Sequence, residues 1–509
     1  MRNKLILSFF ILLKFLIQYF AIHPVYELHR DEYLHLDQGL HLDWGYLSLP
    51  PFTSWISAII FFLGNGEFWV KFFPALFGAL TLYFTWKIIE TLGGNLFACV
   101  LGALAILFSV LVRINTLYQP NSLDFLFWTV SYYFVIKYIL SNENKWLYFL
   151  ALSLGFGFLN KYNIAFLLLG LIPAFIVTPE RKVFRNKHLY YAIGLALIII
   201  SPNLIWQYQN SFPVIYHLNQ LASVQLVNVS ITDFIFSQFL FFFSSIFVIL
   251  AGLYATIFFP LFTKIRVILW SFIFTIGLFI FFSAKSYYTI GLYPVLIGIG
   301  SVYLEKITLS KWKFYLRPAM VIIVIALAIP VLNYALPIYS PETIMNNSEK
   351  YKELGLLRWE DGRDHHLPQD FADMLGWKEM ASKTDEAYKL IDDPEHTIVL
   401  CDNYGEAGAV NYYSSIPDIE AVTFHADYVN WFPLENKIKH VILVKPRNDE
   451  DPDRSRERAF FEEVFVSGEV ENEMAREYGT KIWVLKNASV DINEILKEEI
   501  KKELNERRQ

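Results

Sequence analysis

The chain has 509 residues, of which 55% are hydrophobic and 17% aromatic, and its mean hydropathy is +0.36. This composition excludes an ordinary soluble protein and indicates a polytopic α-helical membrane protein. The formal charge of −6 is unevenly spread, because residues 1–340 carry 21 Lys and Arg but 12 Asp and Glu. The rest of the chain is therefore strongly acidic, which argues against a nucleic-acid partner.

The first apolar segment follows a short basic stretch and resembles a signal peptide, but no small-residue cleavage site follows it, so we predict a retained membrane helix. A membrane span needs roughly 20 apolar residues. The apolar segment at residues 51–63 is too short and is expected to lie at the interface. The sequence predicts about 11 transmembrane helices, at residues 5–22, 68–90, 95–112, 122–140, 146–160, 162–178, 189–206, 233–257, 267–283, 287–304 and 317–338.

The loops between these segments differ in charge. With the N-terminus inside, 15 basic residues fall on the inner side and 5 on the outer side, as the positive-inside rule requires. This topology predicts a membrane domain over residues 1–340, with residues 23–67 as its first outer loop. Residues 341–509 then form a soluble domain outside the membrane.

Adjacent acids, Asp31 and Glu32, follow the first helix directly. Charges inside such an apolar region are costly, and those that are kept usually mark functional sites. One carboxylate is expected to act as a general base, although acids are also ordinary in a loop after a helix. Asp124 opens the fourth predicted span, where an acid in the first helical turn is also favoured by the helix dipole.

Basic residues reach the same outer boundary. Lys161 interrupts a long apolar stretch, and Lys285 precedes Tyr287 and Tyr288. A lysine here either extends toward water or binds an anion, and tyrosines also belong to the interfacial aromatic belt. Together with Arg30, these residues predict a cleft for a lipid-anchored anion, with phosphate as the natural choice.

Metal binding is weakly indicated. Four histidines recur every six residues from His23 to His41, a spacing that does not place them on one helix face. A divalent ion held by Asp31 and Asp124, with or without one histidine, stays an open alternative. Cys99 and Cys401 lie in different parts of the chain, so no disulfide is expected.

The soluble part alternates between helical and strand patterns. We predict an amphipathic helix over residues 377–391, strands at 396–400, 440–444 and 481–485, and a helix after Asn403. This alternation predicts a small α/β domain. The charged segment from Asp491 to Gln509 is expected to be a solvated helix.

The ordered set of motifs resembles the glycosyltransferase family 39-like proteins. These belong to the GT-C superfamily, with dolichyl-phosphate-mannose–protein mannosyltransferases and aminoarabinose transferases. The resemblance covers nearly the whole chain and rests on an ordered set of short motifs, namely Asp31-Glu32, Trp44-Gly45-Tyr46, Pro50-Pro51, Asn121-x-x-Asp124, Asn160-Lys161-Tyr162, Pro202-Asn203-Leu204-x-Trp206, Lys285-x-Tyr287-Tyr288, Leu367 to Trp377, and Asn403 to Ala409.

The resemblance implies a GT-C fold and an inverting transfer of a sugar from a polyprenyl phosphate, expected to be undecaprenyl phosphate. The acceptor would be a lipid, a glycan or a protein, and it would receive the sugar at the periplasmic face of an inner membrane. Asp31 would be the base, with Glu32 and Asp124 as further catalytic acids. The donor phosphate would meet Lys161, Lys285, Tyr288 and Arg30. Whether the sugar is a hexose or a pentose is open, and the implied chemistry names no certain cofactor.

Two other classes of function compete with this interpretation. A transporter or flippase of anionic polyprenyl-linked lipids predicts charges near the bilayer midplane and helices broken in two matching halves. A non-catalytic scaffold predicts that Asp31→Asn is harmless. The charges cluster at the outer boundary instead, which favours the transferase.

Overall fold

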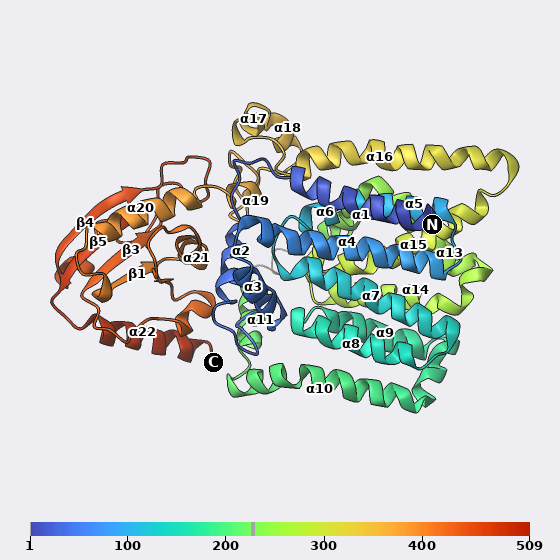
Figure 1. Cartoon of the computed structure of the whole chain (residues 1–509), viewed down its shortest axis with the longest axis horizontal. Coiled ribbons are helices and arrows are strands. Elements are labelled where there is room, and N and C mark those ends of the chain that lie inside the picture. Colours follow the sequence, from blue (N-terminus) through green and yellow to red (C-terminus); the bar gives the residue numbers. More distant parts are fainter. Residues whose placement is uncertain (1, 225–229, 509) are drawn as a thin grey trace.

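The computed structural model describes residues 2–224 and 230–508, which form a helical bundle with a sheet-containing domain at one end (Figure 1). The bundle is built from α1 (Arg2–Phe20), α4 (Glu67–Thr91), α5 (Leu96–Leu107), α6 (Leu111–Ile114), α7 (Pro120–Ser141), α8 (Lys145–Asn160), α9 (Ile164–Ile176), η1 (Pro179–Arg185), α10 (Lys187–Gln209), α11 (Pro213–Val224), α12 (Ile231–Phe241), η3 (Phe243–Ser245), α13 (Ile246–Phe258), η4 (Pro260–Ile265), α14 (Arg266–Phe281), η5 (Ser286–Leu292), α15 (Tyr293–Ile307), η6 (Lys311–Tyr315) and α16 (Leu316–Ala335).

The chain is a multi-pass membrane protein. The predicted spans fall on helical segments, although residues 233–257 cover two helices, α12 and α13, with a bend between them. Within the described ranges, seven helices are long and apolar enough to cross a membrane. The number rises to nine when two bent helix pairs are counted, one bent by 108° after Ile176 and one by 65° after Phe241. The predicted number of about 11 is therefore not reached by this criterion, because helices such as α5 are too short.

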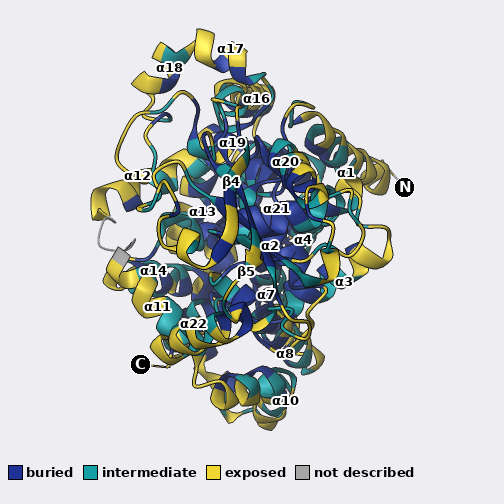
Figure 2. Cartoon of the chain, turned by 90° about the vertical axis from the view of Figure 1, so that its left-hand side faces the viewer, coloured by how far each residue is buried: buried dark blue, intermediate teal, exposed yellow. Residues whose placement is uncertain are grey.

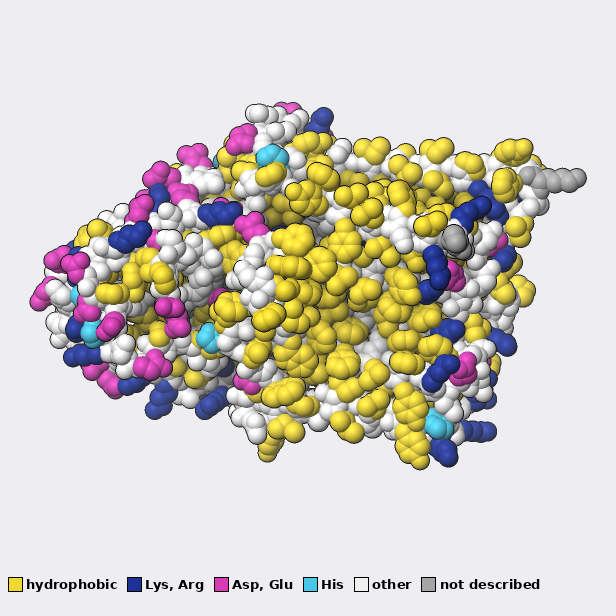
Figure 3. Space-filling model, in the orientation of Figure 1, with side chains coloured by type: hydrophobic (Ala, Val, Ile, Leu, Met, Phe, Trp, Pro, Cys, Tyr) yellow, Lys and Arg dark blue, Asp and Glu magenta, His cyan; other side chains and the backbone are white. Residues whose placement is uncertain are grey.

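The surface of the bundle has the pattern of a membrane protein. Apolar side chains cover its flank, whereas Lys and Arg gather at the end far from the sheet domain (Figure 3). Lys87 and Lys137 belong to this end, near the last turns of α4 and α7. Helices on the outside of the bundle, including α1 and α10, bury few of their residues, and most of their apolar side chains are at least partly exposed (Figure 2). Lipid tails are the environment that suits such a surface.

Two helices within residues 23–67, the segment predicted as the first outer loop and called the outer loop below, lie between the bundle and the sheet domain. They are α2 (Arg30–Asp37) and α3 (Phe52–Phe62), and the second is the short apolar helix expected at the interface. Tyr33 and Leu36 of α2 pack in one apolar cluster with Trp377 and Ala407 of the sheet domain. In Figure 2, α2 and α21 lie at the centre of the view and most of their residues are buried. The outer loop and the sheet domain therefore share a core.

The sheet domain contains five strands in the order β2-β1-β3-β5-β4. The strands β1, β2 and β3 are parallel, and β5 pairs antiparallel with both β3 and β4. In the register, Val399 faces Ala421 and Ile442, and Ile442 faces Val484. The strands are β1 (Thr397–Cys401), β2 (Ala421–Val422), β3 (His440–Lys445), β4 (Phe461–Glu469) and β5 (Lys481–Ala488).

Helices surround this sheet and connect it to α16. They are α17 (Pro341–Asn346), α18 (Ser348–Glu353), α19 (Gln369–Ala372), α20 (Trp377–Lys389), η7 (Pro394–His396), α21 (Tyr404–Tyr413), η8 (Ala426–Asn430), η9 (Glu457–Ala459) and α22 (Ile492–Glu506). Three strands and the helices α20 and α21 were predicted, but β2 and β4 were missed. The predicted C-terminal helix forms as α22 and is exposed over most of its length, but one side, with Ile492 and Leu496, is buried against the sheet and was not predicted.

Candidate active site

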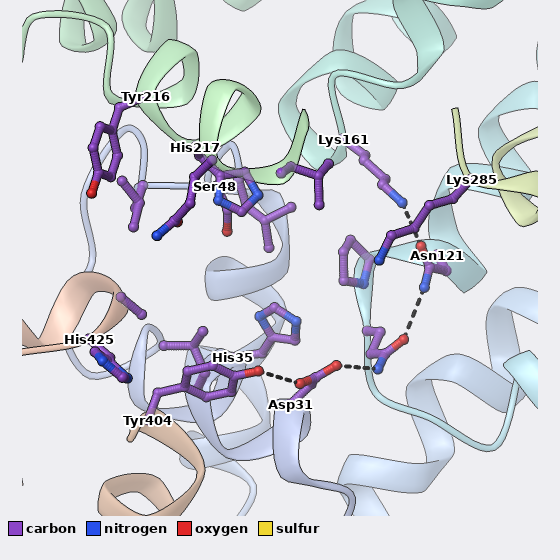
Figure 4. Close-up of a pocket in the computed structure, with 18 of the residues that line it drawn as sticks. Asp31, His35, Ser48, Asn121, Lys161, Tyr216, His217, Lys285, Tyr404 and His425 are labelled. Atoms are coloured by element: carbon purple, nitrogen blue, oxygen red, sulfur yellow. Dashed lines mark hydrogen bonds between the residues drawn. The ribbon is translucent and has the colours of Figure 1, made fainter. Parts of the chain in front are cut away.

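A cavity of about 480 Å³ lies between the end of the bundle and the sheet domain. Its bundle side is formed by α2, the loop before α3, the start of α7, the end of α8, the middle of α11 and the start of η5. Its other side is formed by α21, the start of η8 and α22. Tyr404 and His425 of this side are labelled in Figure 4. The size is typical of a site for a small ligand, and the position places that ligand at the boundary of the apolar flank.

Asp31 points into this cavity from the first turn of α2. The turn is held by a reciprocal cap, in which the His29 side chain accepts from the Asp31 amide and Glu32 accepts from the His29 amide. The Asp31 side chain keeps 39% of its surface exposed. Burial alone would raise its pKa, but His29, Arg30 and a hydrogen bond from Tyr404 act in the other direction, and together with His35 they leave the pKa of Asp31 below its ordinary value. Asp31 is thus an ionised carboxylate facing the cavity.

A continuous chain of hydrogen bonds joins Asp31 to Lys161 (Figure 4). Lys161 Nζ donates to Asn121 Oδ1 at 2.6 Å, and Asn121 Nδ2 donates to Gln119 Oε1 at 2.9 Å. Gln119 Nε2 then donates to Asp31 Oδ2 at 3.0 Å. Every bond in this chain donates toward Asp31, so the lysine charge polarises the amides in the direction of the carboxylate.

The other carboxylate oxygen is held by the sheet domain. The Tyr404 hydroxyl donates to Asp31 Oδ1 at 2.8 Å, and Tyr404 is the first residue of α21. Arg30 lies over the Tyr404 ring at 4.5 Å from its centroid. Arg30 is therefore stacked on a tyrosine of the sheet domain and does not line the cavity.

Lys285 and Tyr288 also line the cavity, as their motif predicts. Lys161 lies 4.5 Å from the ring centroid of Tyr288, a cation–π contact. Within the described residues, the Lys285 side chain makes no hydrogen bond or ion pair, and it extends toward Asn121 (Figure 4). Two lysines therefore face one cavity, and one of them is free to meet an anion.

Glu32 lies outside the cavity. Its carboxylate is fully buried and forms an ion pair with Lys71, with Nζ at 2.6 Å from Oε2. It also accepts from the amides of His29 and Tyr118, each at 2.6 Å. These bonds connect the N-terminus of α2 to α4 and to the loop before α7. The contacts of Glu32 therefore stabilise the local structure.

Asp124 is also buried away from the cavity. Its two oxygens accept from Trp128 Nε1 at 3.1 Å and Asn163 Nδ2 at 2.9 Å. Asp31 and Asp124 therefore do not face each other across one space. In the parts of the chain that the structure describes, no three His, Cys, Asp or Glu side chains gather as a metal ion would require.

Several cavity residues were missed by the sequence reasoning. They are His217 of α11, Tyr404, His425, Glu503 and Arg507. Arg507 donates to the carbonyls of Phe424 and Ala426 and to Glu503, which fixes the end of α22 beside the cavity. Tyr404 did lie within a quoted motif, but nothing local to that motif shows which side chain faces Asp31.

Comparisons with known proteins agree with this architecture. The family described as dolichyl-phosphate-mannose-protein mannosyltransferase matches residues 48–206. ArnT from Cupriavidus metallidurans bound to undecaprenyl phosphate superposes with a TM-score of 0.63 at 16% identity, over 95% of this chain and 98% of that one. The same protein in its apo state gives a TM-score of 0.61 at 13% identity, with the same coverage. A search of curated protein sequences finds no match.

The chain has the GT-C glycosyltransferase fold. The family match begins at Ser48 and ends at Trp206, so it includes Asn121 and Lys161 but neither Asp31 nor the sheet domain. The structural likeness to ArnT extends over 95% of this chain. The cavity thus combines residues inside the family match with residues that lie outside it.

Proposed function

We propose that this protein is a membrane glycosyltransferase that moves a sugar from a polyprenyl phosphate to an acceptor, with inversion at the anomeric carbon. One observation carries the proposal. An ionised carboxylate, Asp31, and two lysines, Lys161 and Lys285, face one cavity at the membrane boundary. A lipid-anchored phosphate can reach such a cavity from the bilayer while its sugar stays in the aqueous part.

The chemistry follows from these groups. An acceptor oxygen attacks the anomeric carbon and forms the new glycosidic bond, while the bond between that carbon and the phosphate oxygen breaks. The electron pair of the broken bond leaves with the polyprenyl phosphate, and the acceptor proton passes to Asp31. Because the leaving phosphate is already a stable anion, no strong acid is required. Lys161 and Lys285 stabilise the charge on the leaving phosphate, as fixed cations do in many transferases.

Glu32, Asp124 and Arg30 take supporting roles in this mechanism. Glu32 and Asp124 have their oxygens engaged by neighbouring donors outside the cavity, so we assign them to positioning. Arg30 holds the ring of Tyr404 and lowers the pKa of Asp31, which makes it an indirect contributor. The donor phosphate is thus assigned to Lys161, Lys285 and Tyr288 alone.

The finer features of the reaction are part of the proposal. Undecaprenyl phosphate is the carrier favoured by the likeness to ArnT, whose structure was determined with that lipid. The excess of basic residues at the far end of the bundle supports a periplasmic cavity in an inner membrane. A hexose or a pentose would suit a cavity of about 480 Å³, and the acceptor is a lipid, glycan or protein.

A donor panel tests the proposal. Purified protein would receive undecaprenyl phosphate carrying radiolabelled mannose, glucose or arabinose, together with extracted membrane acceptors. We expect one donor to lose its sugar to an acceptor, and Asp31→Asn to lower that rate by about 10²- to 10⁴-fold. Asp43→Asn, an exposed acid in the same outer loop, is the matched control and keeps full activity. No transfer from any donor, or equal transfer by Asp31→Asn, would refute the proposal.

A further inference from the structure

The sheet domain contributes directly to the carboxylate that faces the cavity. Asp31 belongs to the outer loop of the bundle, and Tyr404 lies 373 positions later in the sequence, at the start of α21. Their 2.8 Å hydrogen bond is therefore a contact between the two parts of the chain. Tyr404 also lines the cavity itself (Figure 4).

Tyr404 is held firmly in this position. Asn403 caps α21 by accepting from the amides of Gly405 and Glu406, and Glu406 completes the reciprocal cap. Arg30 stacks on the Tyr404 ring at 4.5 Å. At Gly405 a Cβ atom would come within 2.5 Å of Arg30 Cγ, so the helix and the arginine are in close contact. The hydroxyl therefore reaches Asp31 from a rigid support.

The two oxygens of Asp31 are fixed from opposite parts of the molecule. Gln119, at the start of α7, donates to one oxygen at 3.0 Å, and Tyr404 donates to the other at 2.8 Å. A carboxylate with a single donor can rotate about its side-chain torsions, whereas two donors on two oxygens define one orientation. Misplacing a reacting group by about 1 Å can cost 10²-fold in rate.

We propose that Tyr404 is a positioning residue, through which the sheet domain orients the Asp31 carboxylate toward the acceptor and so completes the active site. This inference rests on the proposed function, because Asp31 is the base only in that reaction. It assigns the sheet domain a part in the chemical step in addition to its packing on α2.

The test compares two tyrosines on one helix. Tyr404→Phe removes the hydroxyl but keeps the ring against Arg30. Tyr412→Phe is the matched control, because Tyr412 is also on α21 and donates across the same interface, to the Asn65 carbonyl at 2.8 Å, away from Asp31. Both variants would be assayed with the radiolabelled donor that the wild type consumes, and their thermal unfolding would be followed by tryptophan fluorescence.

We expect Tyr404→Phe to lower kcat by about 10- to 100-fold with the donor KM unchanged, because orientation matters in the transition state more than in binding. Tyr412→Phe should keep kcat and lose no more than a little thermal stability. An equal fall in kcat for both variants would assign the effect to general docking of the domain and overturn the inference. So would a kcat for Tyr404→Phe equal to that of the wild type.

The outcomes separate the two proposals. If the wild type transfers sugar and Tyr404→Phe matches it, the positioning role is wrong and the proposed function stands. If the wild type consumes none of the donors, the proposed function fails, and the positioning role fails with it. A rise in KM alone would also contradict the inference, since it would place Tyr404 in substrate binding.

Discussion

Glu32 and Lys71 form an ion pair of 2.6 Å that fixes the N-terminus of the helix carrying Asp31. The Glu32 carboxylate is fully buried, and it also receives two backbone amides. A buried carboxylate with this number of donors organises the chain around it. The sequence placed Glu32 beside Asp31, the proposed base, but the structure gives Glu32 a different environment, because consecutive helical residues point in different directions.

Removing this charge should destabilise the fold. Glu32→Gln leaves Lys71 without its partner, and the expected loss is about 3–5 kcal/mol of folding free energy. Adding Lys71→Met to Glu32→Gln should recover part of that loss. Thermal unfolding of the purified protein measures both effects. A Glu32→Gln protein that is inactive yet as stable as the wild type would place Glu32 in the chemistry.

Asp124 should behave as a structural acid. In Asp124→Asn one of the two donors, Trp128 or Asn163, meets an amide nitrogen in place of an acceptor, which should cost about 1–3 kcal/mol. The rate per folded molecule should stay within about one order of magnitude of the wild type, since the cavity is intact. Donor transfer and thermal unfolding would be measured side by side. A loss of activity beyond 100-fold at unchanged stability would show that Asp124 takes part in catalysis.

The two cavity lysines should respond differently to substitution. Lys285→Met removes a cation that has no partner within the described residues, so stability should hold while affinity for undecaprenyl phosphate falls about 10- to 100-fold. Lys161→Met also breaks the hydrogen bond to Asn121, so both affinity and stability should fall. Binding of undecaprenyl phosphate to each variant decides the matter. Unchanged affinity in both variants would show that the phosphate binds elsewhere.

The interface between the outer loop and the sheet domain should depend on pH through Asp37. Burial raises the pKa of Asp37 to about 7, despite hydrogen bonds from Tyr428 and Asn411. The folded protein therefore keeps a proton that the unfolded chain releases near its ordinary pKa of about 4. The contribution of this proton to stability is complete at low pH, falls as pH rises from about 4 to 7, and is lost above that range.

Asp37→Asn isolates this contribution, because the amide oxygen can still accept from both donors and carries no charge. Thermal midpoints of wild type and variant would be compared between pH 5 and pH 8. We expect the thermal midpoint of the variant to increase relative to that of the wild type as the pH rises, with most of this change below pH 7. A difference between the two midpoints that stays constant over this range would contradict the assignment.

The C-terminal helix should be needed for a complete cavity. Arg507 holds it in place through the carbonyls of Phe424 and Ala426, at 2.9 and 2.6 Å. Arg507→Ala should destabilise this contact by roughly 1–3 kcal/mol, raise the donor KM, and make α22 more sensitive to protease. Arg508 is an exposed neighbour, so Arg508→Ala is the control and should leave the stability, the donor KM and the protease sensitivity unchanged. Equal protease resistance of both variants would show that Arg507 does not hold the helix.

The sequence by itself was sufficient to predict the helical bundle of the membrane domain. The predicted spans fall on helical segments, because a chain in lipid must satisfy its backbone hydrogen bonds within each segment. The bend after Phe241, inside the predicted span 233–257, was not predicted. It also sufficed for α20, α21, β1, β3 and β5, whose apolar spacing is local. Asp31, Lys161 and Lys285 were placed on one side by alternation of the spans, and the structure brings all three to one cavity.

Other features depended on tertiary structure. The burial of Glu32 and Asp124, and of one side of α22, is decided by which elements pack against them, and the charge pattern of a segment does not contain that information. The contact between Tyr404 and Asp31 joins residues 373 positions apart. Local periodicity determines that a helix forms and which side is apolar, but the partner that each polar side chain meets follows from how the sheet domain packs on α2.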